Sequence, residues 1–241
     1  MIWVQNGEVH LWRWDLDRQE ARPDLLSEDE RARAGRFHFE RDARRWAACR
    51  TLLRVTLGRY LETAPERLEF EVGPWGKPGL RGCPLRFNVS HCGGAALLAL
   101  AWRREVGVDM EDVGRDLAAE ELAPQVLSNQ EQAWLAEHAP EQRPSAFLTL
   151  WTAKEAYVKA AGQGLSFPLS RLTLLPITGT DRFQASEIVS LCPFSVHRID
   201  AGPDYFAALA IEGLLTGIRR FEPHDFESRY DAANQHRYPG V

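Results

Sequence analysis

Long apolar runs are absent from this sequence of 241 residues. The longest one, Ala95 to Trp102, is much shorter than the roughly 20 residues that a helix needs to cross a bilayer. The opening residues, MIWVQNGEVH, lack the basic segment and the apolar segment of a secretory signal peptide. We therefore expect no membrane association and a cytoplasmic location.

Cysteine is also scarce, with four residues at Cys49, Cys83, Cys92 and Cys192. None belongs to a C-x-x-C pair, and histidines do not stand at zinc-ligand spacing, so a zinc site is not expected. We interpret the four as free thiols in a reducing compartment. An overall excess of positive charge is missing too, because the formal net charge is −5, which argues against a nucleic-acid partner.

Positive charge is nevertheless concentrated in one segment, between Arg31 and Arg59. This segment holds nine arginines against only two acids, Glu40 and Asp42. Such a cluster suits a phosphorylated ligand, because guanidinium groups bind phosphate oxygens in pairs. The alternative is a solvated helix face on which most of the arginines contact water.

The most informative feature is an internal repeat. Both halves begin with an alternating strand, continue with a Ser-x-x-Glu capping box and a long helix, and end with short strands. Matching landmarks stand 97 to 107 residues apart: Val9 and Val106, Ser27 and Ser128, Gly58 and Gly162, Phe87 and Phe194. Sequential helices and short strands without regular strand–helix alternation predict an α+β fold of two similar α/β halves, related by a pseudo-twofold axis.

The repeat predicts where the chain divides. An N-terminal half should cover residues 1–104 and a C-terminal half residues 105–220, with a short link near Arg103 to Val106. The polar segment 221–241 has no counterpart in the repeat. We expect it to be a loosely attached extension.

Each half also contains a long helix whose end we place at a glycine, since glycine readily adopts the backbone that closes a helix. The first should run from about Glu40 to Leu57 and stop at Gly58. The second should run from about Ser145 to Ala161 and stop at Gly162. One helix is rich in arginine and the other carries acid, so a ligand held between the halves would meet both kinds of charge.

The strand that opens the second half carries two acids on one face. Asp109 and Glu111 are two residues apart, and alternate side chains of a strand point the same way. Adjacent carboxylates suit Mg²⁺, although D-x-E alone is common and a polar strand edge is the alternative. Glu155 shares an apolar helix face with Trp151, which makes it a candidate third ligand rather than half of a solvated ion pair with Lys159.

Two further motifs carry polar groups. FNVSHCGG places Ser90 and His91 at a strand end, before glycines that let backbone N–H groups approach an anion. A hydrolase is not indicated, because no G-x-S-x-G elbow is present, and His91 could equally be a turn histidine. Lys77 lies in the turn WGKPG, where a lysine is usually exposed, and Lys154 faces away from Glu155 and is interpreted as structural.

In combination, GKP, FNVSH, GVDMED and WTAKEAYVKAAGQGL resemble the signature series of the Sfp-type 4′-phosphopantetheinyl transferases, which carry G-x-D-x-E and W-x-x-K-E-x-x-x-K. The resemblance covers about Arg36 to Leu165. It implies a pseudo-symmetric, monomeric enzyme that moves the phosphopantetheine arm of coenzyme A onto a serine of an apo acyl or peptidyl carrier protein. Coenzyme A and Mg²⁺ would bind between the halves, and 3′,5′-ADP would be released.

The resemblance also implies residue roles. Asp109, Glu111 and Glu155 would hold the metal, and Lys159 would contact the transferred phosphate or its leaving group. We expect Glu155 to be the general base, directly or through water, with Asp109 and Lys159 completing the catalytic set. Which of these groups accepts the proton is left open.

Coenzyme A would be bound by five further residues. Ser90 and His91 would contact phosphate oxygens, Lys77 and Pro78 would flank the nucleotide, and Arg45 would help to bind the 3′-phosphate. The sequence departs from the family pattern in two places. Cysteine stands at position 92 where serine is frequent, and HFERDARR replaces an HKED-like segment, so a phosphate role for Arg36 or Arg41 is undecided.

Two other functions stay open at this point. A Mg²⁺-dependent nucleotidyltransferase or phosphohydrolase could use the D-x-E pair without a carrier protein. A coenzyme A binding module without activity is disfavoured, because all three acids and Lys159 are present. The sequence does not specify whether the carrier serves fatty acid, polyketide or non-ribosomal peptide synthesis.

Overall fold

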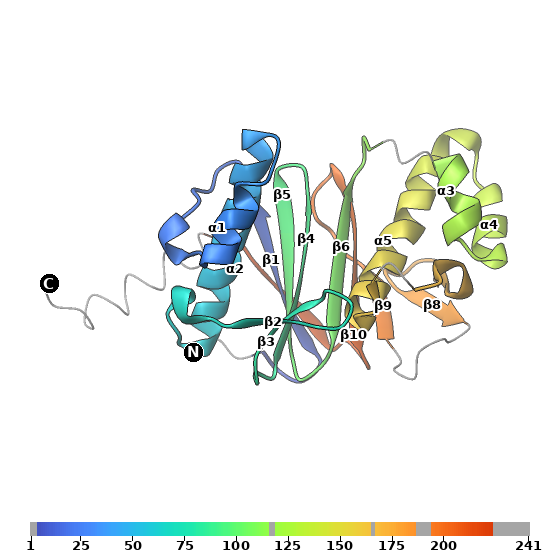
Figure 1. Ribbon diagram of the computed structural model, residues 1–241. Coiled ribbons are helices and arrows are strands. Elements are labelled where there is room, and N and C mark those ends of the chain that lie inside the picture. Colours follow the sequence, from blue (N-terminus) through green and yellow to red (C-terminus); the bar gives the residue numbers. More distant parts are fainter. Residues whose placement is uncertain (1–3, 116–118, 165–166, 187–193, 224–241) are drawn as a thin grey trace, which may run out of the picture.

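The computed structural model describes residues 4–115, 119–164, 167–186 and 194–223. Two sheets lie side by side through the centre of the molecule, and the two long helices flank them on opposite outer sides (Figure 1). Helix α2 (Glu40–Leu61) covers the first sheet, and helix α5 (Arg143–Ala161) packs on the second. No helix in these described ranges has the length and apolar character needed to span a membrane.

The first half is built on a four-stranded sheet of order β11-β1-β5-β4, in which β1, β5 and β4 are antiparallel. A two-stranded hairpin, β2 with β3, extends from it. The elements of this half are β1 (Glu8–Asp15), η1 (Pro23–Leu25), α1 (Glu28–Ala34), α2, η2 (Pro65–Arg67), β2 (Phe70–Val72), β3 (Pro78–Leu80), β4 (Leu85–Cys92) and β5 (Ala95–Trp102).

The second half repeats this order. Its sheet, β6-β10-β9, matches β1-β5-β4 strand for strand, and its hairpin of β7 and β8 matches β2 and β3. The elements are β6 (Val106–Asp112), α3 (Ala119–Val126), α4 (Asn129–Ala136), η3 (Pro140–Gln142), α5, η5 (Leu169–Arg171), β7 (Thr173–Pro176), β8 (Phe183–Ser186), β9 (Phe194–Arg198), β10 (Tyr205–Glu212) and β11 (Gly217–Phe221). The repeat and the α+β fold class are confirmed.

The last described strand returns to the first half. β11 pairs in parallel with β1, and the ring of Phe221 stacks on Trp12 with a centroid distance of 4.6 Å. The chain therefore crosses between the sheets a second time before residue 221. The division into residues 1–104, 105–220 and 221–241 stays a prediction, and most of the expected extension lies outside the described residues.

The helix signals in the sequence were mostly right. Ser27 and Ser128 each cap a helix in a reciprocal capping box, and Gly162 closes α5 with φ 66°. The predicted stop at Gly58 was wrong, because α2 continues to Leu61 and ends at Glu62 with φ 51°. Gly58 serves packing instead, since a β-carbon there would lie 2.6 Å from the carbonyl oxygen of Thr63, where the chain turns back.

Another glycine sets the distance between β6 and α5. A β-carbon on Gly107 would lie 2.1 Å from the carbonyl oxygen of Ala156, so only glycine allows the strand to approach the helix this closely. Apolar side chains of both sheets fill a further cluster between the halves, including Leu11, Leu97 and Val108. Close packing on both sides of β6 holds its polar residues in one place.

Candidate active site

The two halves meet where β4 lies beside β6 (Figure 1). Side chains of β4 bond the backbone of β6 there: Asn88 Oδ1 accepts from the Val108 amide at 2.9 Å, and Ser90 Oγ accepts from the Met110 amide at 3.3 Å. These bonds fix the register between one strand of each half. Polar groups from both halves therefore share this junction, which we call the seam.

Asp109 lies at the centre of the seam and is only 4% exposed. Its Oδ1 accepts a hydrogen bond from Ser90 Oγ at 3.0 Å and forms an ion pair with Lys159 Nζ at 2.5 Å. Its Oδ2 is buried and has no hydrogen-bond partner among the described residues. Burial raises the pKa of Asp109 and Lys159 opposes that rise, so the carboxylate lacks part of the positive charge that it needs.

Lys159 bridges α5 to both strands of the seam. Besides Asp109 it donates to Ser90 Oγ at 3.1 Å, and its side chain keeps 29% of its surface exposed. The sequence allowed a local pair with Glu155, four residues earlier on the same helix. In the fold the ammonium group bonds Asp109, 50 residues away in the chain, with one side open to solvent.

Glu111 occupies the next position on the same face of β6. Its Oε1 accepts from the indole Nε1 of Trp151 at 3.2 Å, and its Oε2 forms an ion pair with Arg115. Both carboxylate oxygens are thus held by protein donors. In the first half the matching places are taken by Trp12 and Trp14, which are fully buried in the core under α2.

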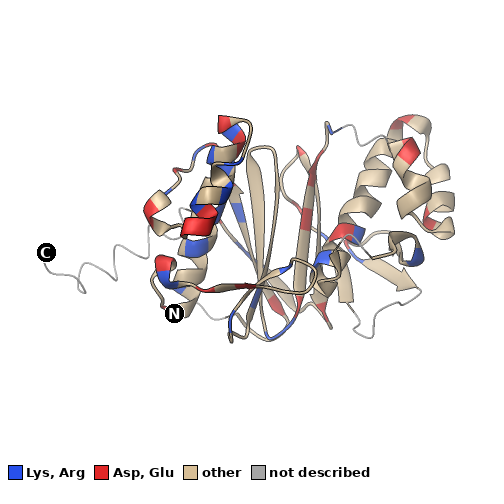
Figure 2. Ribbon diagram, in the orientation of Figure 1, with Lys and Arg blue, Asp and Glu red and all other residues tan. Residues whose placement is uncertain are grey.

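Glu155 faces the same junction from α5. Burial raises the pKa of Glu155, and the negative charges of Asp109 and Glu111 raise it further, with Lys159 acting in the opposite direction. The three predicted metal ligands therefore lie close enough for their charges to interact. Figure 2 shows red segments on both β6 and α5.

These residues suit a hard divalent cation, although they do not yet enclose one. Across the described part of the chain, no three acidic, histidine or cysteine side chains are arranged as a metal cluster. Two of the acids are instead held by Lys159 and Arg115. The donor set nevertheless consists of carboxylate oxygens, and the buried, unpartnered Oδ2 of Asp109 is an oxygen that a cation would satisfy.

His91 stands at the end of β4 and keeps contact with solvent. The pKa of its imidazole is lowered, chiefly by neighbouring protein atoms that displace water, and then by the positive charges of Lys159 and Arg33. The ring therefore favours the neutral form beside two cations. Arg33, at the end of α1, also lies over the ring of Trp46 at 5.5 Å, so α1 contributes to this side of the seam.

Arg45 lies near the turn that follows His91. Its guanidinium group holds Asp17 with two bonds of 2.8 and 2.6 Å, and Arg45 lowers the pKa of that carboxyl. The turn residue Gly94 has room for no side chain here, because a β-carbon would lie 2.4 Å from Asp17 Oδ2. Arg45, the residue predicted to bind the 3′-phosphate, therefore already forms an ion pair with a carboxylate of the protein, and its side chain is 20% exposed.

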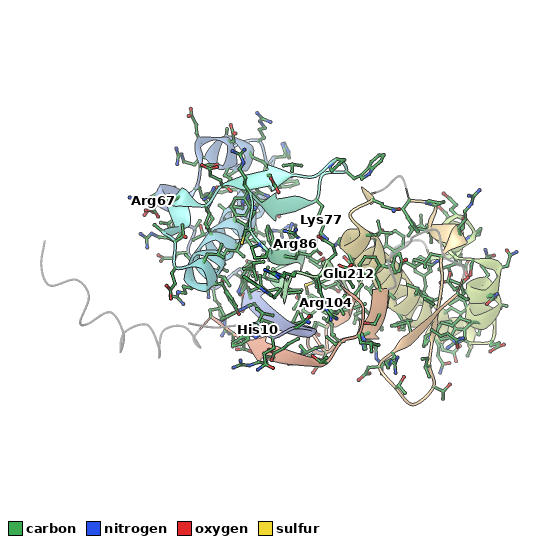
Figure 3. All side chains as sticks on the ribbon, turned by 90° about the horizontal axis from the view of Figure 1, so that it is seen from below. His10, Arg67, Lys77, Arg86, Arg104 and Glu212 are labelled. Atoms are coloured by element: carbon green, nitrogen blue, oxygen red, sulfur yellow. The ribbon has the colours of Figure 1, made fainter. Side chains whose placement is uncertain are left out.

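Lys77 and Pro78 lie on the β2–β3 hairpin, which reaches across to the second half. The Lys77 ammonium group donates to Glu105 Oε2 at 2.7 Å, to the Ala160 carbonyl at 2.9 Å and to the Val106 carbonyl at 3.1 Å. Figure 3 shows it at this junction between the halves. Lys77 thus bonds the last turn of α5, and its proximity to a nucleotide stays a prediction.

The sequence reasoning missed two cations at the seam and the internal use of others. Arg115, four residues after Glu111, could have been found from that spacing, whereas nothing in the sequence links Arg33 to His91. Figure 2 shows the basic residues gathered on α1 and α2. Most of the nine arginines in that segment bind protein acceptors, among them Arg31, Arg41, Arg44, Arg45, Arg50 and Arg54.

Two family profiles match consecutive parts of the chain. Residues 11–103 match the N-terminal region of 4′-phosphopantetheinyl transferase, and residues 105–209 match the 4′-phosphopantetheinyl transferase superfamily. The 4′-phosphopantetheinyl transferase HetI of Nostoc sp. is 40% identical over 169 residues, which cover 67% of this chain and 71% of that protein. The 4′-phosphopantetheinyl transferase Sfp of Bacillus subtilis is 26% identical over 180 residues, covering 74% and 79%.

A solved structure overlaps part of the fold. It is a holo-(acyl-carrier-protein) synthase from Bacillus anthracis in complex with CoA (3′,5′-ADP), 13% identical, with a TM-score of 0.40. The overlap covers 46% of this chain and 96% of that one. At this score the overlap is too loose to assign residues, so the site rests on the contacts described above.

Proposed function

Since the chain belongs to the 4′-phosphopantetheinyl transferase superfamily, and so is an enzyme that transfers phosphopantetheine to carrier proteins, we propose that the transfer depends on Mg²⁺ and releases 3′,5′-ADP. The acceptor would be a serine hydroxyl of an apo acyl or peptidyl carrier protein. We also propose that the enzyme acts as a monomer in the cytoplasm, without nucleic acid or membrane as partner.

One observation carries the metal requirement. The Oδ2 of Asp109 is buried and has no hydrogen-bond partner among the described residues, and the negative charge of Glu111 raises the pKa of both Asp109 and Glu155. These three residues would hold Mg²⁺, which when bound would supply positive charge against the pyrophosphate of coenzyme A. The three acids carry one more charge than Lys159 and Arg115 together supply, which supports this assignment.

The residues of the seam suit phosphoryl-type transfer. The serine oxygen of the carrier would form a bond to the phosphorus on the pantetheine side, while the bond from that phosphorus to 3′,5′-ADP breaks. Lys159, oriented by Asp109 and Ser90, would donate to the phosphate oxygens as negative charge develops. Glu155 would take the serine proton, since its raised pKa makes its ionised form a stronger base.

The remaining predicted residues would bind coenzyme A. Ser90 and a neutral His91 would donate hydrogen bonds to phosphate oxygens. Arg45 would bind the 3′-phosphate, either releasing Asp17 or keeping its bond to Asp17 as well. Lys77 and Pro78 would flank the nucleotide with the backbone of the β2–β3 hairpin, because the ammonium group of Lys77 already donates to the carbonyl of Ala160.

The test is intact-protein mass spectrometry of apo carrier proteins incubated with the enzyme, coenzyme A and Mg²⁺. We expect one carrier to gain a single phosphopantetheine arm and the gain to disappear with EDTA. Chromatography of the small molecules should show one 3′,5′-ADP for each arm transferred. Transfer that persists in EDTA would refute the metal requirement, and no gain across acyl, peptidyl and aryl carriers would refute the proposed acceptor class.

A further inference from the structure

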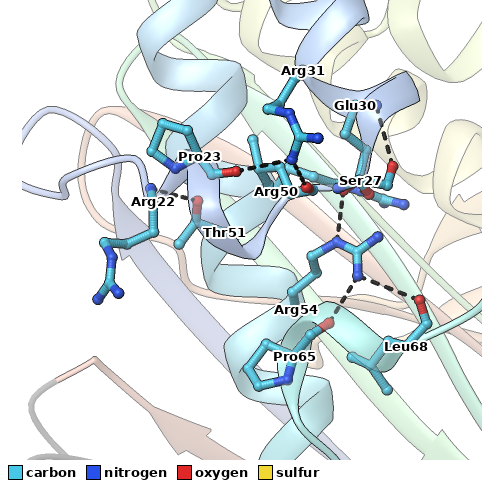
Figure 4. Close-up of polar contacts among 11 residues, drawn as sticks. Arg22, Pro23, Ser27, Glu30, Arg31, Arg50, Thr51, Arg54, Pro65 and Leu68 are labelled. Carbon is cyan, nitrogen blue, oxygen red and sulfur yellow. Dashed lines mark hydrogen bonds and ion pairs between the residues drawn. The ribbon is translucent and has the colours of Figure 1, made fainter.

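Each half contains a buried ion pair built around its capping box. In the first half, Glu30 Oε2 accepts from the Ser27 amide at 2.8 Å and from Arg54 Nε at 2.6 Å. A terminal nitrogen of Arg54 then donates to the carbonyls of Pro65 at 2.8 Å and Leu68 at 3.3 Å (Figure 4). We call this set the Glu30–Arg54 knot. It ties α1, the middle of α2 and η2 together.

The second half holds the same arrangement with a lysine. Glu131 Oε2 accepts from the Ser128 amide at 2.7 Å and pairs with Lys154 Nζ at 2.7 Å. Lys154 then donates to the carbonyl of Leu169 at 2.8 Å and to that of Leu172. We call this set the Glu131–Lys154 knot, and both of its charged side chains are fully buried.

The two knots correspond position by position. Their glutamates are 101 residues apart, their cations 100, and both pairs of carbonyls 104, in line with the spacing of the repeat. The same carboxylate oxygen is used in each. A duplicated device with an arginine in one half and a lysine in the other shows that the function of the cation is to satisfy these three acceptors, whichever residue supplies it.

The knot of the second half differs in what lies next to it. Lys154 directly precedes Glu155 on α5, and successive residues of an α-helix are about 100° apart around its axis. Lys154 is bonded on the outer side of the helix to α4 and to the turn before β7. This bond fixes the rotation of α5, and with it the direction in which Glu155 and Lys159 face β6.

Rotation of α5 would matter because the contacts at the seam are short. A turn of about 20° moves a side-chain tip, about 6 Å from the axis, by about 2 Å. The 2.5 Å contact of Lys159 with Asp109 would not survive such a shift. Displacements near 1 Å in a catalytic group can cost on the order of 100-fold in rate.

We propose that the Glu131–Lys154 knot is a positioning device for the transfer reaction, which sets the rotation of α5 and so aims Glu155 and Lys159 at the seam. This inference rests on the proposed function for its kinetic test. The Glu30–Arg54 knot sets the rotation of α2 in the same way, but α2 carries no proposed catalytic residue.

The variants must avoid leaving one buried charge without its partner, because that alone can unfold the protein. Glu131→Gln with Lys154→Met removes both charges and keeps side chains of similar size. Glu30→Gln with Arg54→Met is the control, since it breaks the equivalent knot in the other half. It also removes the acid that pairs with Arg50, but the Arg50 side chain is 19% exposed and can be solvated. Lys154→Arg is the rescue variant, because an arginine makes the same three contacts in the first half.

The measurements are the melting temperature, kcat and KM for coenzyme A, and crystal structures of the two double variants. We expect the Glu131/Lys154 double variant to fold and to lose about 10- to 100-fold in kcat, with KM changed less than about threefold. The control should lose similar stability with kcat near wild type, and Lys154→Arg should restore most of kcat.

Two kinetic outcomes would overturn the proposal: kcat of the folded Glu131/Lys154 double variant within about threefold of wild type, or an equal fall in the control. The crystal structure provides a test that needs no activity. Unchanged contact between Lys159 and Asp109 in the double variant would also overturn it. An inactive wild-type enzyme would refute the proposed function instead. The rotation of α5 in the crystal structure of the double variant would then test the positioning role of the Glu131–Lys154 knot.

Discussion

Replacing Asp109 with asparagine separates the stability of the seam from its function. The carboxylate is buried, its Oδ2 is unpartnered within the described residues, and Glu111 adds repulsion. Its pKa is raised in the folded protein, so the charged form is disfavoured there. A carboxyl of this kind contributes stability below its unfolded pKa of about 3.9, and that contribution is lost as the pH rises through its folded pKa.

Asparagine at position 109 should therefore stabilise the metal-free protein at pH 7.5. A buried polar atom without a partner, as Oδ2 is, costs about 1–3 kcal/mol, and the loss of the ion pair with Lys159 offsets part of the gain, so we expect a net stabilisation of about 1 kcal/mol. That corresponds to an increase of about 2–4 °C in Tm for a chain of this size. The gain should vanish below about pH 4, where the wild-type carboxyl is protonated in both states.

Asp109→Asn should impair Mg²⁺ binding and catalysis even though it stabilises the metal-free protein. The amide has no negative charge for a cation, so the Mg²⁺-dependent rise in Tm and the transfer reaction should both be lost. Thermal unfolding from pH 3.5 to 8, with and without Mg²⁺, measures both effects.

Asp112→Asn is the matched control, because Asp112 lies on the opposite face of β6 and bonds the amide of Gly114. A destabilised Asp109→Asn protein at pH 7.5, or one that still gains stability from Mg²⁺, would refute the reasoning.

Three further predictions concern the acids and arginines around the seam. Glu111→Gln should abolish Mg²⁺-dependent transfer and leave the fold intact; an active variant with normal circular dichroism would remove Glu111 from the metal site. Arg115→Gln should tighten Mn²⁺ binding measured by electron paramagnetic resonance several-fold, because Arg115 competes for Glu111; an unchanged Kd would contradict this. Arg45→Ala should raise KM for coenzyme A more than for its 3′-dephospho form, with Arg44→Ala, which also contacts Asp17, as control; equal effects on both substrates would disprove the 3′-phosphate role.

Arginines near α2 illustrate why composition alone is ambiguous. Their density predicted either a phosphate site or a solvated face, and the fold uses many of them for a third purpose. Arg50 and Arg54 both pair with Glu30 and lie over the ring of Phe70 at 4.0 and 5.1 Å. Arg45 holds Asp17. Long-range acids that neutralise such arginines are not recognisable from local spacing, because the chain between them can have any path.

Local features of this protein follow from the sequence by itself. The capping boxes at Ser27 and Ser128 and the shared face of Asp109 and Glu111 depend on neighbours within four residues, whose geometry is set by the helix or strand. The internal repeat is visible for the same reason, since each half repeats the local patterns. These patterns were enough to predict the fold class and the motifs that characterise the family.

Partners distant in the chain were decided only by the tertiary structure. Lys159 bonds Asp109 rather than Glu155, Lys154 is buried against Glu131, and β11 returns to β1. Gly58 lies inside its helix because another segment packs on it. Such choices follow from which surfaces exclude water together, and this depends on the whole chain. The reactive groups could therefore be identified from the sequence, whereas packing determined how they face one another.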